Sequence, residues 1–118
     1  MQDLKQRTFD FAVNIGNLVL ELPYNVVNKQ YFNQLIRSSS SVGAKYRAAR
    51  RAKSDADFLH KLKIVEEECD ESLYFLELLS VFNKNHFTKI EPLISEATEL
   101  LKIFVSSINT TRDRLGKK

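Results

Sequence analysis

Hydrophobic residues recur at intervals of three and four positions along most of the chain, and this spacing predicts helices. The most regular run extends from Phe58 to Leu79, where steps of four and three residues alternate without a break. The segment from Ile90 to Ile108 has a similar helical spacing. Strands would alternate at every second residue, so the pattern favours an all-α fold.

Helix-breaking residues are few, because only three glycines and two prolines occur among 118 residues. Pro23 ends the first helical segment, and Ser54 with Asp57 has the form of a capping box at the start of the third. Thr88 and Glu91 predict a second capping box before the fourth helix. Four helices with short connections predict one domain, residues 1–118, folded as an antiparallel up-down-up-down four-helix bundle. The predicted helices span residues 3–22, 26–53, 55–82 and 89–113.

The stretch "RSSSSVGAKYRAARRAKSDADF", residues 37–58, combines a linker-like run of serines with a basic segment. The apolar stripe of the second helix nevertheless continues through it, with Leu35, Ser38 and Val42 on one face. Gly43 inside a helix costs roughly 1 kcal/mol, which tertiary packing must offset. Small side chains allow a neighbouring backbone to come close, so we expect packed helix here and no hinge.

A second apolar stripe on the first two helices points to self-association. A helix in a monomeric bundle needs only one apolar stripe, and a second one is typical of a subunit interface. The alternative is a wide core face with scattered surface hydrophobics, which are common. The residues of the predicted homo-oligomer interface are Phe9, Val13, Gly16, Leu20, Phe32 and Ile36.

Charge is divided between the second and third helices, although the net charge is only +3. Residues 37–53 hold six basic residues and no acid, whereas residues 55–77 hold eight acids. Internal pairing is one interpretation, with Glu68 and Glu71 bound to Lys45 or another base of the second helix. Phosphate binding by an outward basic face is the other. The candidate nucleic-acid-binding residues are Arg37, Arg47 and Arg51, flanked by Lys45 and Arg50.

No catalytic constellation is evident, so we expect a protein that is not an enzyme and needs neither metal nor cofactor. His60 and His86 lack the spacing of helical metal sites, and Cys69 falls in the apolar stripe, where packing is its expected role. A single cysteine and a polar N-terminal segment predict a cytoplasmic, bacterial-type protein. No apolar run is long enough to span a membrane.

The stretch "QLIRSSSSVGAKYRAARRAKSDADFLHKLKIVEEECDESLYFLELL", residues 34–79, resembles the four-helix-bundle proteins encoded in intervening sequences of bacterial 23S ribosomal RNA genes. Lys45 replaces the usual asparagine and Phe75 the usual tryptophan of the family pattern. The motif residues that carry over are Arg37, Ser38, Ser41, Val42, Ala44, Tyr46, Ser54, Phe58, Leu62, Glu68, Asp70, Glu71 and Tyr74; of these, Ser41, Tyr46, Ser54, Glu68 and Glu71 are expected to be structural.

The resemblance implies an antiparallel bundle that assembles into a ring-shaped homopentamer, in a family whose function is largely undetermined. A related protein, the accessory factor of diversity-generating retroelements, binds reverse transcriptase and nucleic acid through a basic surface. We therefore expect a non-enzymatic homo-oligomer that binds RNA, a ribonucleoprotein or a nucleic-acid-handling protein. The alternative is a protein-interaction scaffold that does not bind nucleic acid directly.

Overall fold

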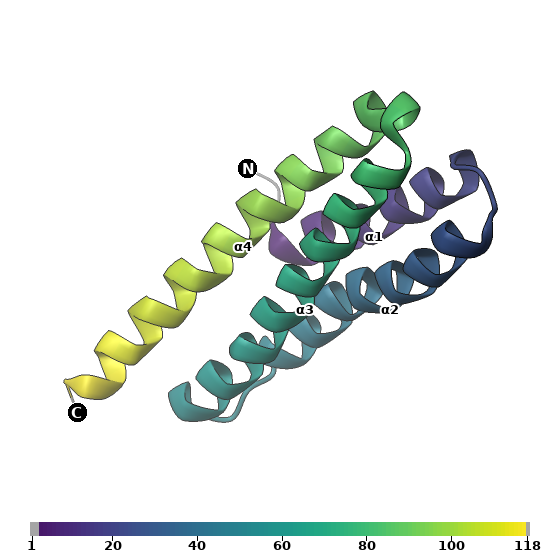
Figure 1. Ribbon diagram of the computed structural model, residues 1–118. Coiled ribbons are helices and arrows are strands. Elements are labelled where there is room, and N and C mark those ends of the chain that lie inside the picture. The colour runs from purple at the N-terminus through teal and green to yellow at the C-terminus, as the bar shows by residue number, and fades with distance from the viewer. Residues whose placement is uncertain (1–2, 118) are drawn as a thin grey trace.

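A computed structural model describes residues 3–117, and these residues form four α-helices and one short 3-10 helix (Figure 1). The elements are α1 (Leu4–Glu21), α2 (Val26–Ala49), α3 (Asp55–Phe82), η1 (Lys84–His86) and α4 (Phe87–Gly116). No strand occurs in this part of the chain, so the predicted all-α fold is confirmed. None of the four helices is long and apolar enough to cross a membrane.

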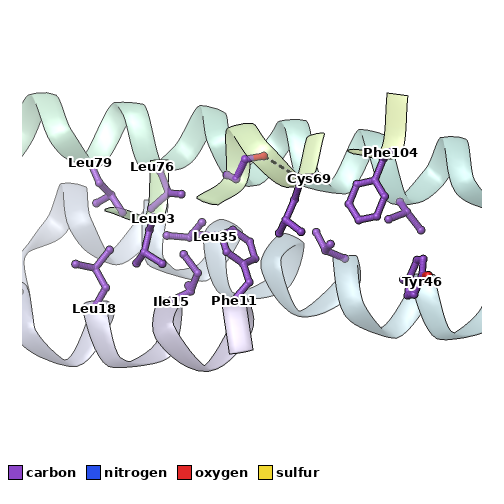
Figure 2. Close-up of a cluster of buried hydrophobic side chains, with 14 of the residues drawn as sticks. Phe11, Ile15, Leu18, Leu35, Tyr46, Cys69, Leu76, Leu79, Leu93 and Phe104 are labelled. Atoms are coloured by element: carbon purple, nitrogen blue, oxygen red, sulfur yellow. Dashed lines mark hydrogen bonds between the residues drawn. The ribbon is translucent and has the colours of Figure 1, made fainter. Parts of the chain in front are cut away.

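The four helices pack into a bundle around one hydrophobic core. Each helix contacts its neighbours in the chain, and α1 also contacts α4. Side chains of α1, among them Phe11, Ile15 and Leu18, point inward toward the other helices (Figure 2). Burial of these apolar surfaces is the main driving force for folding. The predicted stripe of the third helix is buried from Leu62 to Leu79, while Phe58 at its start is half-buried.

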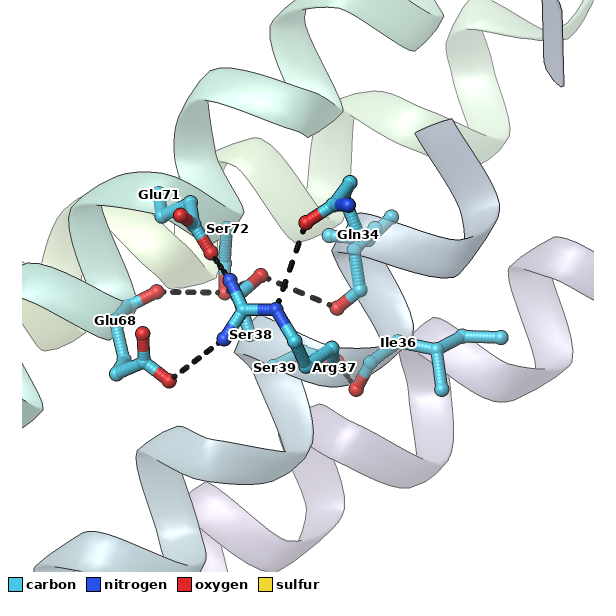
Figure 3. Close-up of polar contacts among 9 residues, drawn as sticks. Gln34, Ile36, Arg37, Ser38, Ser39, Glu68, Glu71 and Ser72 are labelled. Carbon is cyan, nitrogen blue, oxygen red and sulfur yellow. Dashed lines mark hydrogen bonds and ion pairs between the residues drawn. The ribbon is translucent and has the colours of Figure 1, made fainter. Parts of the chain in front are cut away.

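The serine stretch is helical, as predicted, and lies where α2 touches two other helices. The hydroxyl oxygens of Ser38 and Ser72 are 3.0 Å apart and join α2 to α3 (Figure 3). On the α1 side, a Cβ atom at Gly43 would lie only 3.2 Å from Thr8 Oγ1. Both contacts need small side chains, which accounts for a serine at position 38 and a glycine at position 43.

The start of α3 is capped as predicted, since Ser54 Oγ accepts a hydrogen bond from the Asp57 amide at 3.1 Å. The Asp57 carboxylate in turn accepts from the Lys53 amide at 3.1 Å and from Lys61 Nζ at 2.9 Å. These bonds, with the backbone one first, hold the pKa of Asp57 below its ordinary value. Ser54 is therefore the N-cap of the third helix, which begins at Asp55.

The predicted start of the second helix at residue 26 and the predicted end of the third at residue 82 are also confirmed, but three other predicted boundaries need correction. The second helix ends at Ala49 and not at residue 53, because the amides of Arg51 and Ala52 bond three residues back and tighten the chain into a turn. The fourth begins at Phe87, directly after η1, and its N-cap residue makes no side-chain cap bond. The predicted capping box of Thr88 and Glu91 is therefore wrong. The fourth helix also continues past residue 113 to Gly116.

Candidate nucleic-acid interface

Four of the predicted binding residues lie on the exposed second half of α2 and the turn that follows it. Lys45, Arg47, Arg50 and Arg51 are all exposed. None of them forms an ion pair within residues 3–117, although acids of α3 lie on the adjacent helix. Their charge is therefore available to a ligand.

Arg37 differs from the other candidates because it is bound to α3. Its Nη1 lies 3.3 Å from Glu68 Oε2, and its Nη2 pairs with Glu71. Figure 3 shows the guanidinium group between these two carboxylates, with Gln34 beside it. The internal-pairing interpretation thus holds at Arg37, and Glu68 and Glu71 are engaged by this arginine and not by Lys45.

The side chain of Arg47 extends from α2 toward α1, whereas that of Arg37 extends toward α3. The guanidinium carbon of Arg47 lies 5.9 Å from the centroid of the exposed Phe9 ring, a cation–π distance. Ten residues of α-helix advance by about 1000°, which leaves these two arginines roughly 80° apart around the axis. Arg51 follows the end of the helix. The predicted single face of Arg37, Arg47 and Arg51 is therefore corrected to two separate flanks and a turn.

The motif residue Tyr46 supports the position of Arg50. Its ring is buried and packs against Phe104 at 6.1 Å between centroids, while its hydroxyl accepts a hydrogen bond from Arg50 Nη1 at 3.5 Å. This bond is the largest cause of a raised pKa of Arg50, and the negative charge of Asp3 adds to it. The guanidinium group is therefore charged and lies near the start of α1. Of the remaining motif residues, Ser41 is half-buried on α2.

The predicted oligomer interface is largely on the surface, with one exception. Phe9 and Leu20 are 51% and 85% exposed, and Val13 and Ile36 are also exposed. Phe32 is only 4% exposed and belongs to the core of its own chain. It has almost no surface to offer a second copy, so we remove it from the predicted interface.

A groove lies between α1 and α2 within this apolar surface. It has a volume of about 250 Å³. Gly16, which was predicted to belong to the same surface, is half-buried on α1. On the α2 side the groove is lined in part by Gly43 and Ala44, which have little or no side chain. Its lining residues are Lys5, Thr8, Phe9, Ala12, Ser40, Gly43, Ala44 and Arg47.

An aromatic row on the other side of α2 was not predicted. Tyr31 packs against Phe75 and Phe82 with ring centroids 6.1 and 5.9 Å apart, and Tyr74 packs edge-on against Phe75 at 5.4 Å. Tyr74 and Phe82 are exposed. The sequence signal was the pair of aromatics Tyr74 and Phe75, both of which fall outside the apolar stripe of the third helix.

Cys69 occupies the predicted packing position. It is fully buried, and its thiol donates a long hydrogen bond to the Ala97 carbonyl at 3.5 Å. Burial, followed by the negative charges of Asp70, Glu96 and Glu66, raises the pKa of the thiol to about 12. The protonated thiol is not a nucleophile. Within residues 3–117, no group of three or more His, Cys, Asp or Glu side chains is arranged to hold a metal ion.

Comparison with known proteins places this helical bundle in a family. The family model for the 23S rRNA-intervening sequence protein matches residues 2–106, so the chain belongs to that family. A solved structure from Bacteroides thetaiotaomicron VPI-5482, described as a protein with unknown function from the S23 ribosomal protein family, is 36% identical. The match covers 90% of this chain and 98% of that one, with a TM-score of 0.77. No curated protein matches the chain.

Proposed function

We propose that this protein is a non-enzymatic, homo-oligomeric helical bundle that binds RNA or a ribonucleoprotein through Lys45, Arg47, Arg50 and Arg51. The observation that carries the proposal is that these four bases are exposed and that none of them forms an ion pair within residues 3–117. Arginine and lysine side chains of this kind bind phosphates. Arg37 is left out, because Glu68 and Glu71 already neutralise it.

RNA binding is tested with the double variant Arg50→Gln/Arg51→Gln and a fluorescein-labelled RNA hairpin, measured by fluorescence anisotropy. Arg47 is kept, because it contacts Phe9 on the predicted oligomer surface. Its replacement would alter both RNA binding and self-association. Each lost phosphate contact lowers the slope of log K against log salt by about 0.7–0.9. We expect weaker binding and a shallower slope with unchanged helicity. Equal binding by variant and wild type would contradict the proposal.

Homo-oligomerisation is proposed from the exposed apolar residues of α1, namely Phe9, Val13 and Leu20. The pentameric state is the expectation from the family resemblance. Val13→Glu and Leu20→Glu place charges on this surface and are expected to give folded monomers in analytical ultracentrifugation. Val105→Glu is the matched control, because Val105 is an exposed valine of α4. A wild-type monomer at micromolar concentration would exclude the oligomer.

The antiparallel arrangement is also proposed, and three contacts support it. Asn28 near the start of α2 bonds Asn83 at the end of α3 at 2.8 Å. Lys89 of α4 lies 3.4 Å from Glu21 of α1, and Arg114 lies 3.4 Å from Asp55. In each pair the start of one helix meets the end of another. Spin labels at positions 29 and 84 are expected to report a short distance, and a distance of a full helix length would contradict this arrangement.

A protein-interaction scaffold is the second candidate function, and the exposed aromatic row with Tyr74 and Phe82 favours it. Aromatic residues are enriched at protein interfaces. Purification from cells distinguishes the two candidates, because an RNA-binding bundle retains nuclease-sensitive nucleic acid and a scaffold retains protein only. A cytoplasmic location and a single domain over residues 1–118 remain predictions from the sequence.

A further inference from the structure

The helices have unequal lengths, and one end of the bundle lacks α1. With 18 residues α1 is about 27 Å long, whereas α4 with 30 residues is about 45 Å long. Arg7 near the start of α1 donates two hydrogen bonds, both of 2.8 Å, to Glu96 in the first half of α4. The second half of α4 therefore extends past α1, toward the connection between α2 and α3 (Figure 1).

The end of α4 is basic and lies beyond the region that the family model matches. That match stops at residue 106. The helix continues to Gly116, and residues 107–117 carry Arg112, Arg114 and Lys117 against one acid, Asp113. All four side chains are exposed. The extension therefore adds positive charge that the family comparison does not account for.

This extension lies at the same end of the bundle as the α2–α3 connection. Arg114 Nε is 3.4 Å from Asp55 Oδ2, and this ion pair fixes α4 beside the start of α3. The connection itself carries Arg50, Arg51 and Lys53 and no acid in residues 50–53. Residues 50–53 and 107–117 together hold six bases and one acid.

The two acids in the first turn of α3 are already engaged by the chain. Asp55 pairs with Arg114, and Asp57 accepts hydrogen bonds from the Lys53 amide and from Lys61. Arg112 and Lys117 form no ion pair within residues 3–117, so both retain a full charge for a ligand. Tyr46 and Phe58 are the aromatic residues that flank the connection in sequence, and the first is buried and the second half-buried. The surface offers phosphate contacts and no stacking platform.

We propose that Arg112 and Lys117 of α4 join Arg50, Arg51 and Lys53 in one surface, the basic end, that binds the phosphate backbone of structured RNA, while Arg114 stays paired with Asp55. This inference rests on the proposed RNA binding and extends it to a second element of the fold. Recognition at the basic end is independent of base sequence, because it reaches phosphates and not base edges.

The test compares Arg112→Gln/Lys117→Gln with Lys29→Gln/Lys84→Gln. Both variants lose two positive charges from exposed side chains that form no ion pair in the described chain, but Lys29 and Lys84 lie at the opposite end of the bundle. Anisotropy of a fluorescein-labelled RNA hairpin is measured over a potassium chloride series. Circular dichroism checks that each variant retains the helical signal of the wild type.

Loss of two phosphate contacts is expected to lower the salt slope by about 1.4–1.8 and to weaken binding by about tenfold or more at 0.15 M salt. The Lys29→Gln/Lys84→Gln control is expected to bind as the wild type does. If both double variants change the affinity and the salt slope of RNA binding by the same amount, binding does not depend on where the charges lie, and the basic end is refuted. If Arg50→Gln/Arg51→Gln weakens binding but Arg112→Gln/Lys117→Gln does not, the proposed function survives and this inference fails. If the wild type binds no RNA, both fail.

Discussion

Asn28 and Asn83 exchange two hydrogen bonds through their side-chain amides, with N···O distances of 2.8 and 2.9 Å. Each amide nitrogen also donates to a backbone carbonyl, Asn28 to Pro23 at 2.9 Å and Asn83 to Leu79 at 2.8 Å. Both residues are buried. All four amide N–H donors therefore have acceptors, and the pair joins the start of α2 to the end of α3.

Asn28→Ala is expected to destabilise the fold by about 1–3 kcal/mol, because it leaves buried polar groups of Asn83 without a partner. The matched control is Asn33→Ala on the exposed surface of α2, which should change stability by less than about 0.5 kcal/mol. Urea unfolding followed by circular dichroism measures both. Equal unfolding free energies for the two variants would show that the amide pair contributes nothing.

Gly43→Ala is expected to destabilise the protein although alanine is the better helix former. The new Cβ would lie 3.2 Å from Thr8 Oγ1, and this hydroxyl is held by hydrogen bonds to Leu4 and Lys5 carbonyls at 2.7 and 3.2 Å. Gly16→Ala is the control, since nothing lies within 4 Å of its added Cβ. It should stabilise by about 0.5–1 kcal/mol.

Thermal unfolding at one protein concentration compares the two glycine variants. Thr8→Ala removes the hydroxyl and should restore much of the stability of Gly43→Ala, as measured by a double-mutant cycle. A stabilisation of equal size at both glycines would mean that α1 and α2 are not closely apposed at Gly43.

Arg37→Gln is expected to lower stability by up to about 1 kcal/mol, because exposed ion pairs contribute little and this one is half-exposed. It should leave the salt slope of RNA binding unchanged, since its charge is already used by Glu68 and Glu71. Chemical denaturation and anisotropy give the two readouts. A slope reduced by as much as in Arg50→Gln/Arg51→Gln would return Arg37 to the binding surface.

The thiol of Cys69 is expected to resist labelling by Ellman's reagent at pH 8 and to react once the protein is unfolded. Burial raises its pKa to about 12, whereas the unfolded chain releases this proton near the ordinary value of about 8.5. The thiol's contribution to stability is therefore complete below about pH 8.5 and is lost as the pH rises toward 12. Cys69→Ser should respond less to alkaline pH, and rapid labelling of the folded wild type would contradict burial.

The helices and the core were predictable because apolar residues repeat in the sequence at the spacing that places them on the buried face of a helix. The stripe from Leu62 to Leu79 and the helical serine stretch both followed from it. The helix ends were less predictable, since the turn after Ala49 depends on hydrogen bonds that residue type does not reveal. The Asn28–Asn83 pair joins residues 55 positions apart, and periodicity gives no information on such contacts.

The sequence identified the basic residues of the candidate interface but not how their side chains are arranged on the surface. Arg37 and Arg47 lie about 80° apart around the axis of α2 and were counted as one broad face, whereas their long side chains reach in different directions to α3 and α1. Phe32 was expected at the oligomer interface, although it is buried in the core of its own chain. The bases at the end of α4 were missed because their proximity to residues 50–53 depends on the unequal lengths of α1 and α4.

Amide hydrogen exchange across residues 38–43 tests the central claim most directly, namely that this stretch is a rigid, packed helix from which the bases of α2 are held outward. The account predicts exchange as slow as in the buried middle of α3 around Cys69 and Ser72, because opening would require separation of α2 from both α1 and α3. Exchange as fast as in the turn at residues 50–53 would contradict it.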